Sequence, residues 1–104
     1  MLIKVNTDNN INGHERLEDY VTEQLQHALK KFDERITRLE VHLGDENSTK
    51  FGTKDKRCMI EARPAGLKPV AIEHHADTIE KAISGASDKI KSVLEHTFGK
   101  LSAH

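Results

Sequence analysis

Seven histidines and one cysteine are the residues of this chain that most readily suggest a metal or a catalytic site. His74 and His75 are adjacent, and neighbouring residues of a strand point to opposite faces, so this pair cannot easily share one ion. His42, Cys58 and His74 could converge across three strands, but nothing in their spacing requires it. We therefore expect no metal site and no cofactor.

Cys58 is the one candidate nucleophile, with His42 as its possible base. It alternates with Ile60 and Ala62, however, and this phase indicates a small buried thiol rather than a reactive one. The chain has no glycine-rich phosphate cradle, no serine elbow and no HExxH zinc motif. We expect that it is not an enzyme.

The basic residues give a stronger signal, because their distribution along the chain is uneven. The net charge of −1 excludes a general polycation that binds nucleic acid through net charge alone. Residues 50–68, however, contain six basic residues and only two acidic ones. Such a local excess suits contacts with phosphates. The candidate contacts in this segment are Lys56, Arg57, Arg63 and Lys68.

Two expected helices add further basic side chains. His96 and Lys100 each fall within about 20° of Lys89 around an α-helix. Nearer the N-terminus, His27 and Lys31 share one flank beside an apolar stripe. These rows could face a polyanion. Alternatively, the lysines could simply cover the edge of the core while their ammonium groups stay in water.

The periodicity of the apolar residues predicts the elements that must position these side chains. Spacings of three and four residues predict one helix over residues 14–32 and another from a capping sequence at Asp77–Glu80 to Leu101. Strict alternation predicts strands. These strands are expected over residues 1–6, 39–43, 58–63 and 67–74, with a long exposed loop over residues 44–57. Pro69 suggests that the last strand lies at an edge.

The expected order is therefore β-α-β-β-β-α. Strands with one apolar face and helices with one apolar stripe combine most simply as an α+β fold. We expect a four-stranded, mainly antiparallel sheet with both helices on one face. A chain of 104 residues without internal repeats or a linker fits one domain, residues 1–104.

Composition excludes several function classes. No segment approaches the roughly 20 apolar residues that cross a bilayer, and the N-terminus lacks the apolar region of a signal peptide. The single cysteine excludes an internal disulfide. We expect a cytoplasmic protein with no membrane partner and no small-molecule substrate. One tyrosine and three phenylalanines argue against base stacking on an aromatic platform.

Over almost its whole length, the chain resembles the ribosome hibernation promoting factor family, also called ribosome-associated inhibitor proteins. No single motif carries the resemblance, which rests on the order, spacing and length of several segments together. They are the strand IKV at 3–5, the helix at 17–32, LEVHL at 39–43, CMIEARP at 58–64 and the helix around 82–94. The chain resembles the short form of the family, which lacks a second, dimerising domain.

The resemblance implies a fold similar to a double-stranded-RNA-binding domain. It also implies a translation inhibitor that binds the small ribosomal subunit in the channel used by mRNA and tRNA. Such a protein would contact ribosomal RNA, and ribosomal proteins as well, and silence ribosomes in stationary phase or stress by steric occlusion. Lys31 and Lys89 match positions where family members carry lysine.

Two other functions remain open on the residues alone. A small α+β module could use its open sheet face for protein contacts or dimerisation. A binder of structured RNA could act away from the ribosome. Salt distinguishes the first from any phosphate-binding protein, because only phosphate contacts weaken steeply as the salt concentration rises.

Overall fold

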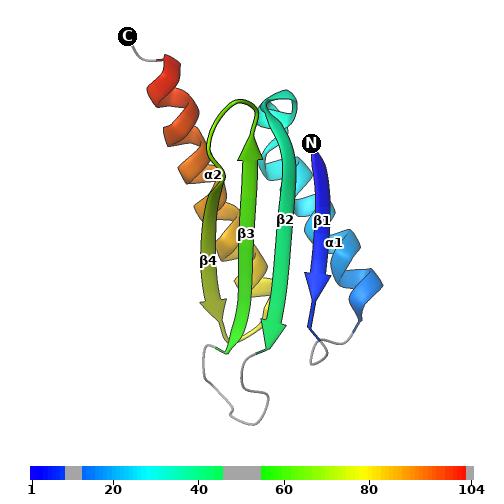
Figure 1. The fold of residues 1–104 in the computed structure, drawn as a ribbon. Helices are drawn as coiled ribbons and strands as arrows, with labels where there is room; N and C mark the ends of the chain where they lie inside the picture. Colours follow the sequence, from blue (N-terminus) through cyan, green and yellow to red (C-terminus); the bar gives the residue numbers. More distant parts are fainter. Residues whose placement is uncertain (9–12, 46–54, 103–104) are drawn as a thin grey trace.

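The computed structural model describes residues 1–8, 13–45 and 55–102. Their elements follow the predicted order, with one short 3-10 helix in addition (Figure 1). The elements are β1 (Leu2–Thr7), α1 (His14–Ala28), η1 (Lys30–Arg35), β2 (Ile36–Asp45), β3 (Lys56–Pro64), β4 (Val70–Ala76) and α2 (Ile79–Ser102). The prediction of an α+β fold is confirmed.

The four strands form one sheet in the order β1-β2-β3-β4. β1 runs parallel to β2, from Leu2 beside Arg38 to Thr7 beside Leu43. The β2–β3 and β3–β4 pairs are antiparallel. The parallel pair needs a crossover, which α1 supplies, and Figure 1 shows α1 and α2 on the same face of the sheet. The predicted layers, and the edge position of the last strand, are confirmed.

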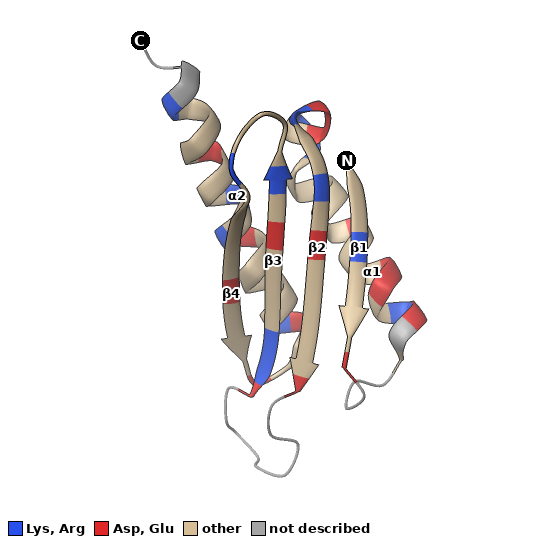
Figure 2. Cartoon of the chain, in the orientation of Figure 1, with Lys and Arg blue, Asp and Glu red and all other residues tan. Residues whose placement is uncertain are grey.

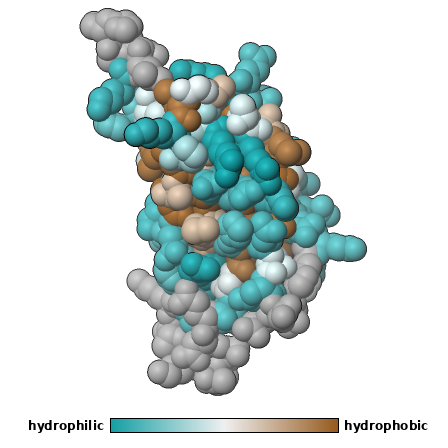
Figure 3. Space-filling model, in the orientation of Figure 1, coloured by the Kyte–Doolittle hydropathy of each residue, from teal (hydrophilic) through white to brown (hydrophobic). Residues whose placement is uncertain are grey.

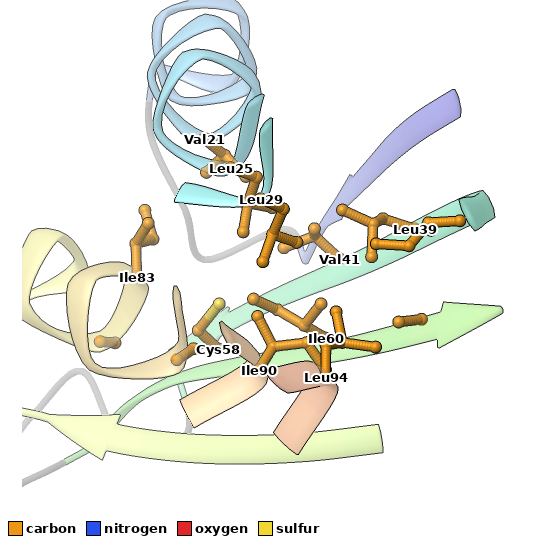
Figure 4. Close-up of a cluster of buried hydrophobic side chains, with 14 of the residues drawn as sticks. Val21, Leu25, Leu29, Leu39, Val41, Cys58, Ile60, Ile83, Ile90 and Leu94 are labelled. Carbon is orange, nitrogen blue, oxygen red and sulfur yellow. The ribbon is translucent and has the colours of Figure 1, made fainter. Parts of the chain in front are cut away.

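The core lies between the sheet and the two helices (Figure 4). Alternate residues of the central strands point into it, and each helix contributes one stripe of side chains, as the periodicity predicted. Its largest fully buried apolar side chains are Val21, Leu25, Leu29, Ile36, Leu39, Val41, Cys58, Ile60, Ile83, Ile90 and Leu94. None of the described helices covers the opposite face of the sheet, which we call the open face.

The first helix is shorter than predicted. α1 ends at Ala28, and η1 carries the chain through Phe32 with 3-10 geometry, the N–H of Phe32 donating to the carbonyl of Leu29 at 2.9 Å. The tighter turn still buries Phe32, whose ring lies 4.9 Å from that of Phe98 on α2. The guanidinium of Arg35 lies 3.9 Å from the centre of the Phe98 ring. These contacts join η1 to the last turns of α2.

The predicted exposed loop over residues 44–57 is wrong at both ends. β2 continues to Asp45 and β3 begins at Lys56, where the two residues pair. Gly44, Asp45 and Asp55 are buried. The strands therefore extend into polar sequence, where Lys56 makes ion pairs with both aspartates. The middle of the predicted loop, residues 46–54, lies outside the described residues. β4 also begins later than predicted, at Val70, because Pro69 cannot donate to a ladder.

The cap of α2 is Thr78, the second residue of the predicted capping sequence, and not Asp77, its first residue. The hydroxyl of Thr78 accepts a hydrogen bond from the backbone N–H of Lys81 at 3.2 Å. This bond satisfies one of the N–H groups that the start of a helix leaves without a partner. Asp77 instead makes an ion pair with the Lys81 side chain at 3.2 Å.

Candidate nucleic-acid interface

His42, Cys58 and His74 do not share one face of the sheet. Cys58 points into the core, while His42 lies on the open face of the sheet beside Met59. Burial raises the pKa of the Cys58 thiol to about 12, so the reactive thiolate is scarce at neutral pH. His74 pairs with Cys58 across the β3–β4 ladder, on the helix side. The alignment of His42, Cys58 and His74 considered from sequence is therefore split between two faces.

Within the described ranges, no three His, Cys, Asp or Glu side chains gather closely enough to hold a metal ion. None of the described helices has both the length and the apolar content to cross a membrane. What the described surface does offer is charge, arranged in three separate places.

The first place is the end of the sheet where β2 stops and β3 starts. Here the Lys56 ammonium lies 3.2 Å from a carboxylate oxygen of Asp45 and 3.2 Å from one of Asp55. Partial burial alone would lower the pKa of Lys56, but the hydrogen bonds to Asp55 and Asp45 and the charges of both carboxylates outweigh it. The pKa is therefore raised above its ordinary value. Lys56 is charged, but its charge is already matched within the protein.

The second place is the open face of the sheet. Arg57 donates to Glu73 at 3.2 Å, and Arg63 donates to Glu61 at 3.1 Å. Arg38 pairs with Glu40, two residues further along the same strand, β2. Figure 2 shows the resulting alternation of basic and acidic residues along the strands, and Figure 3 shows a largely hydrophilic face with smaller apolar areas. The predicted contacts Arg57 and Arg63 therefore lie on a surface where basic and acidic side chains nearly balance in charge.

The third place is the helix side. A shallow pocket of about 500 Å³ lies where the end of α1 and the start of η1 meet α2. Its polar lining is basic throughout; we call these four residues the helix-side basic cluster, and they are His27, Lys30, Lys31 and Lys91.

Glu95 borders this cluster, and Asp33 and Glu34 line a neighbouring pocket together with Lys30 and Lys31. Lys31 makes an ion pair with Glu95 at 2.6 Å. The pKa of the Glu95 carboxyl lies below its usual value, mainly because Lys31 donates a hydrogen bond to it. Desolvation raises this pKa, but the positive charges of Lys31 and Lys91 lower it further. The side-chain ammonium groups of Lys30 and Lys91 make no hydrogen bond or ion pair with another described residue. These two ammonium groups are therefore available to an external anion.

Sequence analysis missed Lys30 and Lys91. Both lie on helical segments, but the arithmetic of a single helix cannot show that two helices place their lysines beside one pocket. A helix contact is needed to bring Lys30 and Lys91 together, and only the packing of α1 and η1 against α2 provides it.

A comparison with protein families matches residues 3–102 to the family described as Sigma 54 modulation protein / S30EA ribosomal protein. The match spans nearly the whole chain. The chain belongs to this family. The resemblance to the ribosome hibernation promoting factors stated from the sequence is thereby confirmed at the level of the family.

Two solved structures resemble this S30EA-family chain in fold. The N-terminal domain of Thermus thermophilus Protein Y aligns with a TM-score of 0.73 and 21% identity, covering 93% of this chain and 99% of that one. A ribosomal subunit interface protein from Coxiella burnetii aligns with a TM-score of 0.76 and 14% identity, covering 95% and 99%. No curated protein matches the chain by sequence.

The two residues that the family resemblance singles out now have positions. Lys31 belongs to the helix-side basic cluster. Lys89 is exposed on α2 and donates to the backbone carbonyl of Glu73 on β4 at 3.0 Å. That acceptor carries no net charge, so the ammonium keeps its positive charge for another partner. The remaining predicted contacts, Lys68 and Lys100, lie by a different groove at the far end of α2.

Proposed function

We propose that this S30EA-family protein is a cytoplasmic ribosome hibernation factor that binds the small ribosomal subunit in the channel used by mRNA and tRNA. Bound there, it silences the ribosome by steric occlusion under stress or in stationary phase. The observation that carries the proposal is the family match over residues 3–102. The absence of any assembled catalytic group in the described residues is consistent with a protein that acts by occupying space.

The described surface supports a particular mode of RNA binding. Folded ribosomal RNA presents mainly its phosphate backbone, and proteins recognise such RNA by shape and by contacts to phosphate and ribose. Lys30 and Lys91 of the helix-side basic cluster, together with Lys89, can supply those contacts, whereas Lys31 already pairs with Glu95. We propose that this side of the molecule faces the RNA. Lys56, Arg57 and Arg63 contribute less, because carboxylates within the protein already compensate them.

Co-sedimentation with purified small subunits in a sucrose gradient tests the proposal. The wild-type protein should move with the subunits at low salt. The double variant Lys30→Glu/Lys91→Glu should bind at least about tenfold more weakly, because two attractive contacts become repulsive ones. Protein that stays in the light fractions at low salt would show that the proposal is wrong.

A matched control separates the site from net charge. Lys4→Glu/Lys81→Glu changes the charge by the same amount, but Lys4 lies on exposed β1 and Lys81 in the first turn of α2. This variant should sediment like the wild type. Chemical footprinting of the small-subunit RNA should then show protection where mRNA and tRNA bind. Protection elsewhere on the subunit would reject the proposed channel while leaving ribosome binding intact.

A further inference from the structure

A second surface of the molecule has a different character. The turn between β3 and β4 lies beside the C-terminal half of α2 (Figure 1). Between them is a groove of about 530 Å³, which we call the turn–helix groove. It is lined by Leu67, Lys68, Val70, His96, Thr97 and Lys100.

The floor of the turn–helix groove is apolar. Leu67 is one of three large apolar side chains that the described residues leave exposed, with 36% of its surface accessible. Val70 beside it is half-buried. The Thr97 hydroxyl donates to the carbonyl of Val93 at 2.8 Å, so its polar group is already satisfied within α2. The floor therefore offers apolar contact and little demand for hydrogen bonds.

The rim of the groove is basic. Lys68, His96 and Lys100 are exposed, and none of their side chains makes an ion pair or hydrogen bond with another described residue. Among the residues that the structure describes, no acidic one lines the groove. This differs from the open face of the sheet, where Arg57 and Arg63 are paired with glutamates. The groove thus combines an exposed apolar floor with uncompensated positive charge.

This combination discriminates between two classes of polyanion. A phosphate backbone needs the cations but gains nothing from leucine and valine, and RNA bases stack on aromatic rings, which the lining of this groove lacks. An acidic peptide with an apolar side chain uses both features. Its apolar group leaves water against the floor, and its carboxylates meet the lysines at the rim.

We propose that the turn–helix groove binds a short acidic peptide segment of a partner protein, anchored by one aliphatic or aromatic side chain against Leu67 and Val70. Carboxylates of the segment pair with Lys68 and Lys100. This assigns those two lysines to a protein contact, separate from the RNA contacts proposed for the helix-side basic cluster.

The test uses the full chain and a fluorescein-labelled peptide that alternates aspartate or glutamate with leucine. Fluorescence anisotropy measures its binding at low salt, and a labelled RNA hairpin is the second probe. The acidic peptide should bind, and a peptide with serine in place of every leucine should bind at least about tenfold more weakly. NMR amide shifts should change at residues 67, 68, 70 and 96–100.

Two matched pairs of variants locate the site. Leu67→Glu should weaken peptide binding at least about tenfold, because it removes the apolar floor and adds a repulsive charge. Leu2→Glu makes the same change at an exposed leucine on the far edge strand, and should alter binding less than about twofold. Lys100→Glu should weaken binding, whereas Lys4→Glu, with the same charge change, should not. Circular dichroism melts confirm that each variant is folded.

Three results would overturn the inference. The peptide could fail to bind, or bind equally well to the Leu67→Glu and Leu2→Glu proteins. The RNA hairpin could instead bind in a way that depends on Lys100 but not on Leu67, which would make the groove part of an RNA surface. Ribosome co-sedimentation of Leu67→Glu, measured in parallel, reports on the proposed function separately.

Discussion

Gly85 shows how one residue can be fixed by a neighbour that is remote in the sequence. It lies in the interior of α2, where glycine is about 1 kcal/mol less favourable than alanine. A Cβ atom at this position would overlap the imidazole of His74 on β4. The absence of a side chain therefore lets the His74 ring lie against the helix, between β4 and α2.

Gly85→Ala should consequently destabilise the protein, despite the better helix propensity of alanine. We expect a loss of about 1–3 kcal/mol in the free energy of unfolding, from the forced displacement of the His74 ring. In a His74→Ala background the same substitution should stabilise the protein by about 0.5–1 kcal/mol, because the space is then empty. Urea denaturation of the four proteins measures both effects. Stabilisation by Gly85→Ala in the wild-type background would show that the ring moves aside without cost.

At the scale of elements, α2 illustrates what periodicity can determine. Ile83, Ile90 and Leu94 lie fully buried against the sheet, as their spacing predicted (Figure 4). Ser84 is exposed one residue further along. The apolar stripe predicts which residues of the helix face the core and which face solvent, so one residue can be buried while the next is exposed.

Ile83→Asp should therefore unfold the domain, whereas Ser84→Asp should be tolerated. A carboxylate at position 83 would be buried without a partner, at a cost of several kcal/mol against a typical total stability of about 5–15 kcal/mol. At position 84 the same group stays in water, and the change should lie within about 0.5 kcal/mol. Thermal melts followed by circular dichroism distinguish the two. A cooperative melt of Ile83→Asp near the wild-type temperature would contradict the assigned core.

The ends of the elements were harder to predict than their cores, for physical reasons. A residue three positions after Leu29 is buried in an α-helix and in a 3-10 helix alike, so Phe32 could not reveal where α1 stops. Alternation also fails where polar residues are buried together. Asp45 and Asp55 are buried at the end of the sheet because Lys56 lies between them, and a contact of that kind is invisible in a hydrophobic pattern.

For the whole molecule, composition established how many charges there are but not which of them are available. The seven predicted contacts lie in separate places: the sheet face and its end, the helix-side basic cluster, exposed Lys89 and the turn–helix groove. Sequence arithmetic counted Arg57 and Lys68 alike, although Arg57 is paired with Glu73 on the neighbouring strand β4 and Lys68 has no described partner. Pairing depends on strand register, and register was not fixed by the sequence pattern.

Salt dependence is the property of the whole molecule that follows from this arrangement. If about three lysines on the helix side neutralise RNA phosphates, the logarithm of the ribosome-binding constant should fall with the logarithm of salt concentration with a slope of roughly −2 to −3. Lys91→Gln should reduce the magnitude of that slope by about one, because one phosphate contact is lost.

Lys4→Gln is the matched control, since it removes the same charge from β1 and should leave the slope unchanged. Binding isotherms at four or more salt concentrations give each slope. A slope near zero for the wild-type protein would favour association through apolar protein contacts instead. An equal change of slope for Lys4→Gln and Lys91→Gln would mean that the ribosome responds to net charge, and that the helix side has no special part in binding.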